Sequence, residues 1–459
     1  MGTSDPKINL SKVKSIYDLK KHFFYMLKNP MLINVIIVGF MTLIVKGMGF
    51  FKEMQVGRAF GLSEIIDTFL IASLIPGFIN AVFMSSFQNV FIPNYIAERN
   101  LNKNIGSFQS SFIIIIVFLG IILSFIAYLF TVFFLEDIFK GHTFMYYELV
   151  RSQFYILLPC ILLWSFSSFL GGLLEINNLF SFSSIYPIIT SLAVLLCLIF
   201  FKNELGFRVL SFGMLVGSIL EVVYLVSISV LKKTLRLAKP DFLSGNIIRL
   251  YRQLPSKIGS SFLTGTTGFV NQFFAAQLVI GSIAAFNYGL KIPSFLASIL
   301  IISLGNVLLP YFSDLAHKNR LKAYKVLYRT IIYTFVFSLM IAGTLYLFSD
   351  SIISYLFEKG NFTSGDTLIV SKIQKILLIY VPFYISSIII IKFLTSINQN
   401  AYMFYASILN LILNIVLNYY FVKMYNINGI AIATTLVYIS NFLVLILFLN
   451  HQRKRDSII

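Results

Sequence analysis

The chain has 459 residues, of which 58% are hydrophobic and only 12% are charged, and its mean hydropathy is +0.85. A soluble domain is nearer a quarter charged, so this composition excludes an ordinary soluble protein. The apolar residues form continuous runs of about 20, the length of a helix that crosses a bilayer, and they do not alternate as barrel strands do. We therefore predict an all-α polytopic membrane protein.

Twelve apolar stretches follow one another along the chain, and each is a candidate transmembrane helix. The first six lie near 31–51, 65–95, 106–135, 151–174, 182–201 and 209–231. The second six lie near 257–279, 283–312, 330–349, 373–397, 402–422 and 427–450.

One stretch occurs twice. Residues 75–93 and 292–310 both begin with Ile-Pro, carry Phe two residues after the proline, and end with Asn-Val-x-x-Pro at the same spacing. Internal duplication in an apolar chain is typical of transporters built from repeats. We predict two parallel six-helix bundles around a central cavity. The helices are expected to bend at the prolines of the repeat, which are Pro76, Pro93, Pro293 and Pro310.

The basic residues suggest an orientation. Lys and Arg concentrate in the first 30 residues, between 232 and 257, between 318 and 329, and after residue 452, so these segments are expected in the cytoplasm. The net charge of +18 then faces anionic lipid head groups, and nucleic acid is not an expected partner. The predicted division is a cytoplasmic tail (1–30), a bundle (31–231), a cytoplasmic connector (232–256), a bundle (257–450) and a cytoplasmic tail (451–459).

Lysines inside or next to the spans are candidate substrate-binding groups, because a buried charge in a membrane is costly unless it faces a cavity or a partner. Lys46, Lys52 and Lys291 are expected to form a cationic region shared by the two halves. Such a region suits an anionic substrate such as a diphosphate, and the apolar side chains around it suit a lipid tail.

Other polar positions are candidates for the cavity or its gates. Asp67 could cap the second span or pair with a lysine, and Lys392 could snorkel or pair. Glu175 and Glu221 are expected to reach the membrane interface. The remaining candidates for cavity or gating roles are Glu53, Arg58, Asn80, Ser85 and Asn271.

Catalytic chemistry has no signature in the sequence. There is no metal-ligand spacing, no phosphate-binding loop and no nucleophile elbow. Cys160 and Cys197 lie in apolar segments and are expected to be small core residues. We predict no metal, no cofactor and no enzyme activity.

Several motifs in order resemble the MurJ/MviN family of lipid II flippases, which belongs to the multidrug/oligosaccharidyl-lipid/polysaccharide (MOP) exporter superfamily. The motifs are Gly49-Phe-x-Lys-Glu53, Arg58-x-Phe-Gly61, Asp67-x-Phe69, Ile75-Pro76, Phe91-Ile-Pro93, residues 291–310, Leu356-Phe-x-x-Gly-x-Phe-Thr363 and Asn426-x-x-Gly429. The resemblance covers roughly residues 31 to 450.

The resemblance implies a flippase that moves an undecaprenyl-diphosphate-linked saccharide across the bacterial inner membrane by alternating access. It places Lys46, Lys52 and Lys291 where the family usually has Arg. The chain departs from the family at Asn80 and Ser85, where an Arg and a Glu are common, and it ends after the twelfth span, where the family has two more helices. The cargo is therefore expected to be lipid II or a repeat unit of O-antigen, capsule or exopolysaccharide.

Two other functions stay open. A drug/cation antiporter of the same superfamily would favour acidic groups in the cavity. A membrane polysaccharide polymerase or glycosyltransferase would need a large extracytoplasmic loop or an acidic metal motif. We expect a monomer with both termini in the cytoplasm, in contact with membrane lipids and with saccharide-assembly enzymes as candidate partners.

Overall fold

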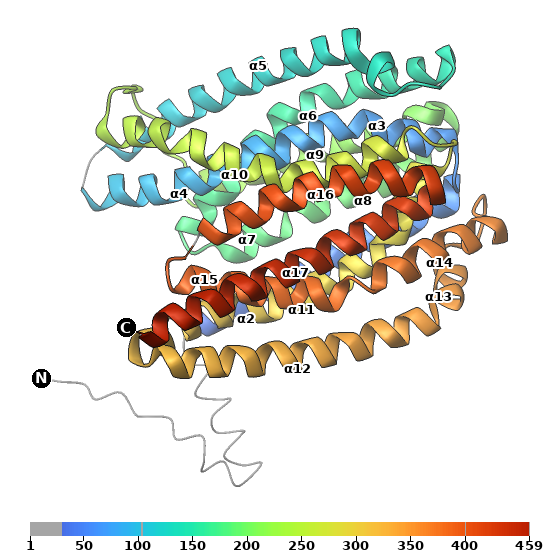
Figure 1. Cartoon of the computed structure of the whole chain (residues 1–459). Coiled ribbons are helices and arrows are strands. Elements are labelled where there is room, and N and C mark those ends of the chain that lie inside the picture. The colour runs from blue at the N-terminus through green and yellow to red at the C-terminus, as the bar shows by residue number, and fades with distance from the viewer. Residues whose placement is uncertain (1–29, 102–103, 400, 459) are drawn as a thin grey trace, which may run out of the picture.

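A computed structural model describes residues 30–101, 104–399 and 401–458; the side chains of 30–36, 84–85, 264, 302–307 and 457–458 lie outside this description. Long helices run side by side in two groups (Figure 1). The first group contains α2 (Pro30–Phe60), α3 (Glu64–Ile79), η2 (Asn80–Met84), α4 (Ser85–Asn100), α5 (Ile105–Ile138), α6 (Phe144–Ile176), α7 (Phe180–Ile185), α8 (Pro187–Leu205), η3 (Gly206–Arg208) and α9 (Val209–Leu231).

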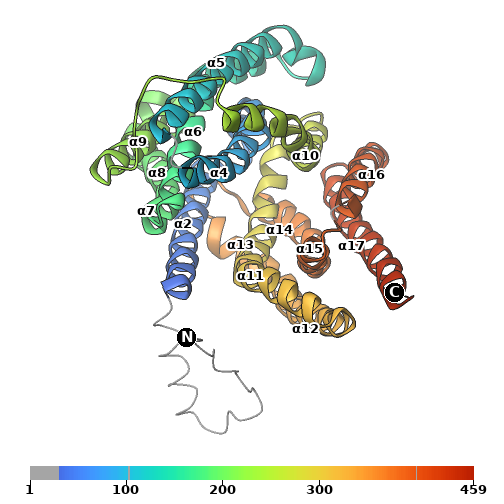
Figure 2. The same ribbon diagram turned by 90° about the vertical axis from the view of Figure 1, so that its left-hand side faces the viewer.

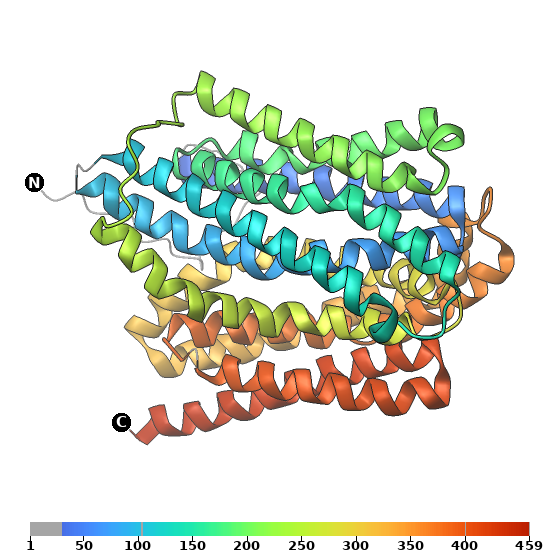
Figure 3. The ribbon, with the colours of Figure 1, turned by 90° about the horizontal axis from the view of Figure 1, so that it is seen from above.

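The second group repeats this order. It contains α10 (Gly245–Ala275), α11 (Ser282–Lys318), α12 (Arg320–Leu347), α13 (Ser349–Phe357), α14 (Ser364–Leu378), α15 (Val381–Ser396), α16 (Ala401–Tyr425) and α17 (Ile427–Ile458). Figure 3 shows the first group, blue to green, on one side and the second, yellow to red, on the other. The predicted all-α architecture is confirmed.

Nine stretches of the described residues are long and apolar enough to cross a membrane, and one of them, Phe180–Leu231, contains both α8 and α9. Neither α2 nor α10 is among these stretches. The first residues of α2 lie outside the described side chains, whereas α10 carries charged side chains and is rich in Ser, Thr and Gly, and one face of it lines a cavity described below. The exact number of twelve spans stays a prediction.

The two copies of the duplicated stretch differ in backbone conformation. In the first copy, α3 contains Pro76 and gives way to the π-helical turn η2, after which α4 contains Pro93. Proline lacks an N–H and crowds the preceding turn, which is a common reason for such an interruption. In the second copy, α11 continues as α-helix through Pro293 and Pro310. Bending at the prolines stays a prediction, but the symmetry of the sequence is not kept in the helices.

The connector between the halves is fixed to the first half. The side chain of Gln109 on α5 is fully buried; its amide donates to the carbonyl of Thr234 at 3.0 Å and its carbonyl accepts from the N–H of Arg236 at 2.7 Å. The hydroxyl of Ser111 also accepts from the N–H of Asp241 at 2.8 Å. The helix α10 begins at Gly245, so Arg249, Arg252 and Lys257 lie on its first turns and not in a loop.

The halves meet differently on their two sides. Figure 2, which looks at the end of the bundle where α2 begins and α17 ends, shows α4 beside α10 and shows α2 standing apart from α11. We call this the terminal end and the opposite end the far end. Packing of α4 on α10 includes a hydrogen bond of 2.8 Å from Asn94 to Gln253 and another from Asn246 to Glu98. Contacts of α2 with α11 include Phe50 with Phe295, in the far-end part of α2.

Candidate functional site

Backbone and side-chain hydrogen bonds join the two halves at the far end. The guanidinium of Arg58, near the end of α2, donates to the carbonyl of Leu356 on α13 at 2.8 Å. Asn361 donates through its backbone N–H to the carbonyl of Arg58, and through its side chain to that of Ala59, both at 2.8 Å. Arg58 therefore joins the two halves.

Asp67 joins the halves a few residues later. Its carboxylate is buried, with 2% of the residue exposed, and accepts from the N–H groups of Gly281 at 2.6 Å and Ala284 at 2.9 Å. Gly281 is the N-cap residue of α11 and Ala284 lies in its first turn, where the helix dipole favours a negative charge. Asp67 thus caps a helix of the other half. Neither alternative derived from the sequence is correct, since α3 has no side-chain cap and Asp67 forms no ion pair in the described part of the chain.

A compact charge cluster lies deeper between α2 and α11. Glu53 accepts from the ammonium group of Lys52 at 2.7 Å and from that of Lys291 at 3.1 Å. About a quarter of each of these three side chains is exposed, so the cluster is shielded but not sealed. Two of the three lysines predicted to share a cationic region, Lys52 and Lys291, therefore lie on one carboxylate, whereas Lys46 is not part of this cluster. The structure adds what the sequence did not indicate, a carboxylate placed between the two cations.

A cavity of about 610 Å³ opens next to this cluster, mainly within the second half. Lys46 contributes from α2, and α10 and α11 supply small and polar side chains such as Thr267, Gln272 and Asn287. Aromatic walls come from Tyr380, Tyr384 and Tyr438. Lys46 and Asn271 line the cavity, whereas Lys52 and Lys291 sit on the same helices outside its lining.

Asn271 belongs to a buried amide network at one wall of the cavity. It donates to the hydroxyl of Thr434 at 3.0 Å, and its carbonyl accepts from Asn414 and Asn418, both at 3.0 Å. The network is not fully satisfied, because the side-chain carbonyl oxygens of Asn414 and Asn418 have no hydrogen-bond partner among the described residues. The hydrogen bonds of Asn271 therefore link three helices, α10, α16 and α17.

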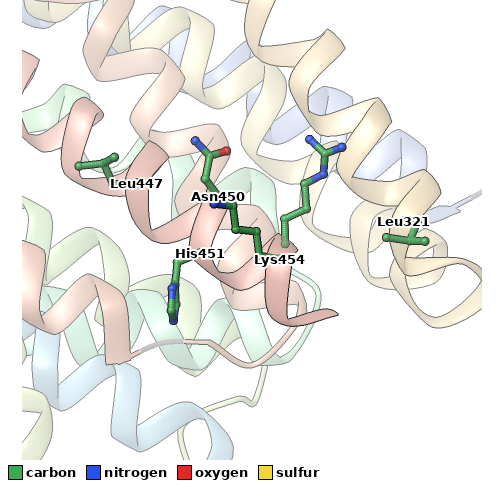
Figure 4. Close-up of a pocket in the computed structure, with 6 residues that line it drawn as sticks. Leu321, Leu447, Asn450, His451 and Lys454 are labelled. Atoms are coloured by element: carbon green, nitrogen blue, oxygen red, sulfur yellow. The ribbon is translucent and has the colours of Figure 1, made fainter. Parts of the chain in front are cut away.

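The remaining candidates lie elsewhere. Asn80 begins the π-helical turn η2 and lines a separate cavity of about 330 Å³ inside the first half. Lys392 is half-buried on α15 and is not among the residues that line the cavities. The side chain of Ser85 lies outside the described residues. Another cavity, of about 680 Å³, lies at the terminal end between α12 and α17 and is lined by residues that include His451, Arg453 and Lys454 (Figure 4).

One expectation for an acidic residue is wrong. Glu221 does not reach the membrane interface: it lies in the middle of α9, is 5% exposed, and accepts a hydrogen bond of 2.7 Å from Thr190 on α8. The apolar sequence around it is compatible with either face of a helix. Only the packing of α9 on α6 and α8 decides that this face is buried.

The fold and this arrangement define a membrane transporter built from two helical bundles whose facing helices carry paired charges beside a cavity. Two similar structures show the same fold. They are titled "Lipid II flippase MurJ, inward closed conformation" (TM-score 0.80, 23% identity, covering 90% of this chain and 87% of that chain) and "Inward-facing conformation of a multidrug resistance MATE family transporter of the MOP superfamily" (TM-score 0.74, 12% identity, covering 92% and 98%).

The chain belongs to the family described as "Lipid II flippase MurJ", whose model matches residues 56–458. A probable lipid II flippase MurJ of Buchnera aphidicola subsp. Baizongia pistaciae is 27% identical over 428 residues, covering 90% of this chain and 82% of the relative. One of Aquifex aeolicus is 25% identical, covering 73% and 66%. The predicted family is confirmed: the protein is a multi-pass flippase of the MOP superfamily and not an enzyme, which sets aside the polymerase and glycosyltransferase alternative.

Proposed function

We propose that this protein moves a polyprenyl-diphosphate-linked saccharide between the leaflets of the bacterial inner membrane. Lipid II, named for its relatives, is the first candidate cargo, and a surface-polysaccharide repeat unit is the second. The observation that carries the proposal is the Lys52–Glu53–Lys291 cluster. It places two cations from different halves around one carboxylate, beside a cavity with aromatic and polar walls.

The carboxylate between the lysines has a physical role in this proposal. Without cargo, Glu53 offsets the electrostatic repulsion between the two ammonium groups, because its carboxylate lies between them and pairs with both. A diphosphate carries more negative charge and more acceptor oxygens than a carboxylate, so it can compete for both lysines. Lys46, which lines the neighbouring cavity, would add a further cation. The substrate head group thus replaces Glu53 as the partner of the lysines. When the head group leaves, Glu53 pairs with them again, so the lysines are not left as uncompensated charges.

Alternating access would require the contacts between the halves to open at one end of the bundle while the halves close at the other. In this structure the far end is joined by Arg58, Asn361 and Asp67, while α2 and α11 diverge toward the terminal end. We propose that the terminal end faces the cytoplasm, as the basic tails and connector suggest. Cargo would then enter from the inner leaflet and leave after the far-end contacts open.

The test is a flipping assay in proteoliposomes with a fluorescent undecaprenyl-diphosphate-linked disaccharide. We expect Lys52→Gln and Lys291→Gln each to lower the rate at least about tenfold, because each removes a charge-assisted contact with the diphosphate. Lys375→Gln is the matched control, since this lysine pairs with Asp350 within the second half at the far end. Wild-type rates in both site variants would overturn the proposal. Comparison of lipid II with a surface-polysaccharide repeat unit decides between the two cargoes.

A further inference from the structure

The first half contains a second polar cavity that the flippase proposal does not use. It has a volume of about 330 Å³ and is lined by residues of η2, α4, α6 and α9, together with the beginning of α8. Its one acidic residue is Glu221, and its polar walls include Asn80, Gln88 and Ser168. A carboxylate inside a membrane bundle is costly unless a cation or a proton accompanies it.

Glu221 has no basic partner in the described part of the chain. Among the described residues, no Lys or Arg forms an ion pair with it, and it accepts a hydrogen bond from the hydroxyl of Thr190. The titratable groups that face it from the neighbouring helices are Cys160 on α6 and Tyr186 ahead of α8, with Glu175 beyond Tyr186. A thiol and a phenol are neutral near pH 7, so they do not supply the missing positive charge.

A second observation points to a ligand in the same cavity. The hydroxyl of Ser167, which is 3% exposed and lines the cavity, has no hydrogen-bond partner among the residues that the structure describes. Buried polar atoms of native proteins are nearly always satisfied, so an unpartnered hydroxyl beside an uncompensated carboxylate indicates an occupant with positive charge. The available oxygens on the walls suit a small ion, and the hydroxyl of Thr190 can also present a lone pair to it.

We propose that this cavity is a cation site in which Glu221 takes up one proton or one monovalent metal ion. A bound proton would neutralise the carboxylate, and a bound metal ion would balance its charge. No other bond is formed or broken. Occupancy can influence the two halves because the cavity wall includes Asn80 and Ala81 of the π-helical turn η2. That turn packs directly on α10 of the second half, where Gly265 closely approaches the side chain of Val82. The site thus adjoins an interface that alternating access must rearrange.

The chain provides its own reporter. Trp164 is its single tryptophan, it lines this cavity, and its indole N–H donates to Ser218, about one helical turn before Glu221 on α9, at 2.9 Å. The fluorescence of Trp164 is measured in nanodiscs without any lipid-linked saccharide. The pH is varied over roughly 5 to 9, which brackets neutrality, in choline chloride and in NaCl. Because no cargo is present, failure of this test leaves the flippase proposal untouched.

We expect the emission of Trp164 to change in one transition that Glu221→Gln removes. The matched control Glu204→Gln, an exposed carboxylate on α8 of the same half, should keep the transition. Thr190→Val should move the midpoint upward by about one pH unit, because the hydroxyl stabilises the charged carboxylate. This variant tests the proposal even if Glu221→Gln does not fold.

The salt arm identifies the occupant. If NaCl changes the emission at fixed pH and Glu221→Gln abolishes the change, the ligand is a metal ion; if only pH acts, it is a proton. Emission that responds to neither pH nor Na⁺ would overturn the proposal. A transition that persists unchanged in folded Glu221→Gln would overturn it as well, as would an unshifted midpoint in Thr190→Val.

Discussion

Replacement of Asp67 by Asn should open the far end. The carboxylate accepts from two backbone N–H groups, those of Gly281 and Ala284, and it lies at the positive end of α11. Asparagine has nearly the same shape but only one acceptor oxygen. Its amide nitrogen must therefore face one of the two N–H groups, so one charge-assisted hydrogen bond becomes a contact between two donors.

The size of the effect can be worked from these contacts. A hydrogen bond to a charged group contributes about 1.5 to 3 kcal/mol, and the interaction of a charge with a helix terminus adds about 0.5 to 1 kcal/mol. If the contact exists only while the far end is closed, the loss of about 3 kcal/mol shifts the equilibrium roughly a hundredfold toward the open state.

The assay is chemical labelling of a reporter cysteine. Asn287→Cys places a thiol on α11 at the cavity wall, and the native Cys160 and Cys197 are both buried. A membrane-impermeant maleimide is applied from the side that the far end faces. We expect Asp67→Asn to raise the labelling rate of this cysteine by at least tenfold.

The control is Asp350→Asn. Asp350 also lies near the far end, but it pairs with Lys375 of its own half at 2.6 Å, and the hydrogen bond from that lysine lowers the pKa of the Asp350 carboxyl. The control should label as slowly as the parent. The reasoning is refuted if Asp67→Asn labels at the parental rate while the protein remains folded, because the contact would then be present in both states.

Three further changes test the packing. Phe357→Ala should lower the unfolding free energy by about 3 kcal/mol, measured by denaturation in detergent, because this fully buried ring contacts Phe50, Tyr288 and Phe362; a loss below about 1 kcal/mol would contradict it. Gly281→Ala should lower the melting temperature, because the φ of Gly281 is +91° and a Cβ there would lie 2.8 Å from the carbonyl oxygen of Leu62. An unchanged melting temperature would show that the turn tolerates a side chain. Gln109→Leu should release the connector and speed tryptic cleavage at Lys233 or Arg236, with Gln272→Leu, at the cavity, as the comparison that leaves cleavage unchanged.

Local features of the sequence determined the class of the protein. Runs of about 20 apolar residues require helices, because a lipid environment leaves backbone groups no other partners. The repeated Pro-containing stretch predicted two related halves, and the motifs from Gly49 to Gly429 predicted the family, which the comparisons confirm. The rarity of charge in an apolar chain also directed attention to Lys52 and Lys291, which both pair with Glu53.

Pairings between the halves were decided only by the tertiary structure. Whether Asp67 caps its own helix or another depends on where α11 begins in space, and Gly281 lies in the other half of the chain. The burial of Glu221 depends on which face of α9 packs against α6 and α8, and the serines that share its face, such as Ser211 and Ser218, do not by themselves show whether that face meets another helix. The sequence therefore determined which residues are costly in a membrane, and the packing of distant helices determined how each cost is offset.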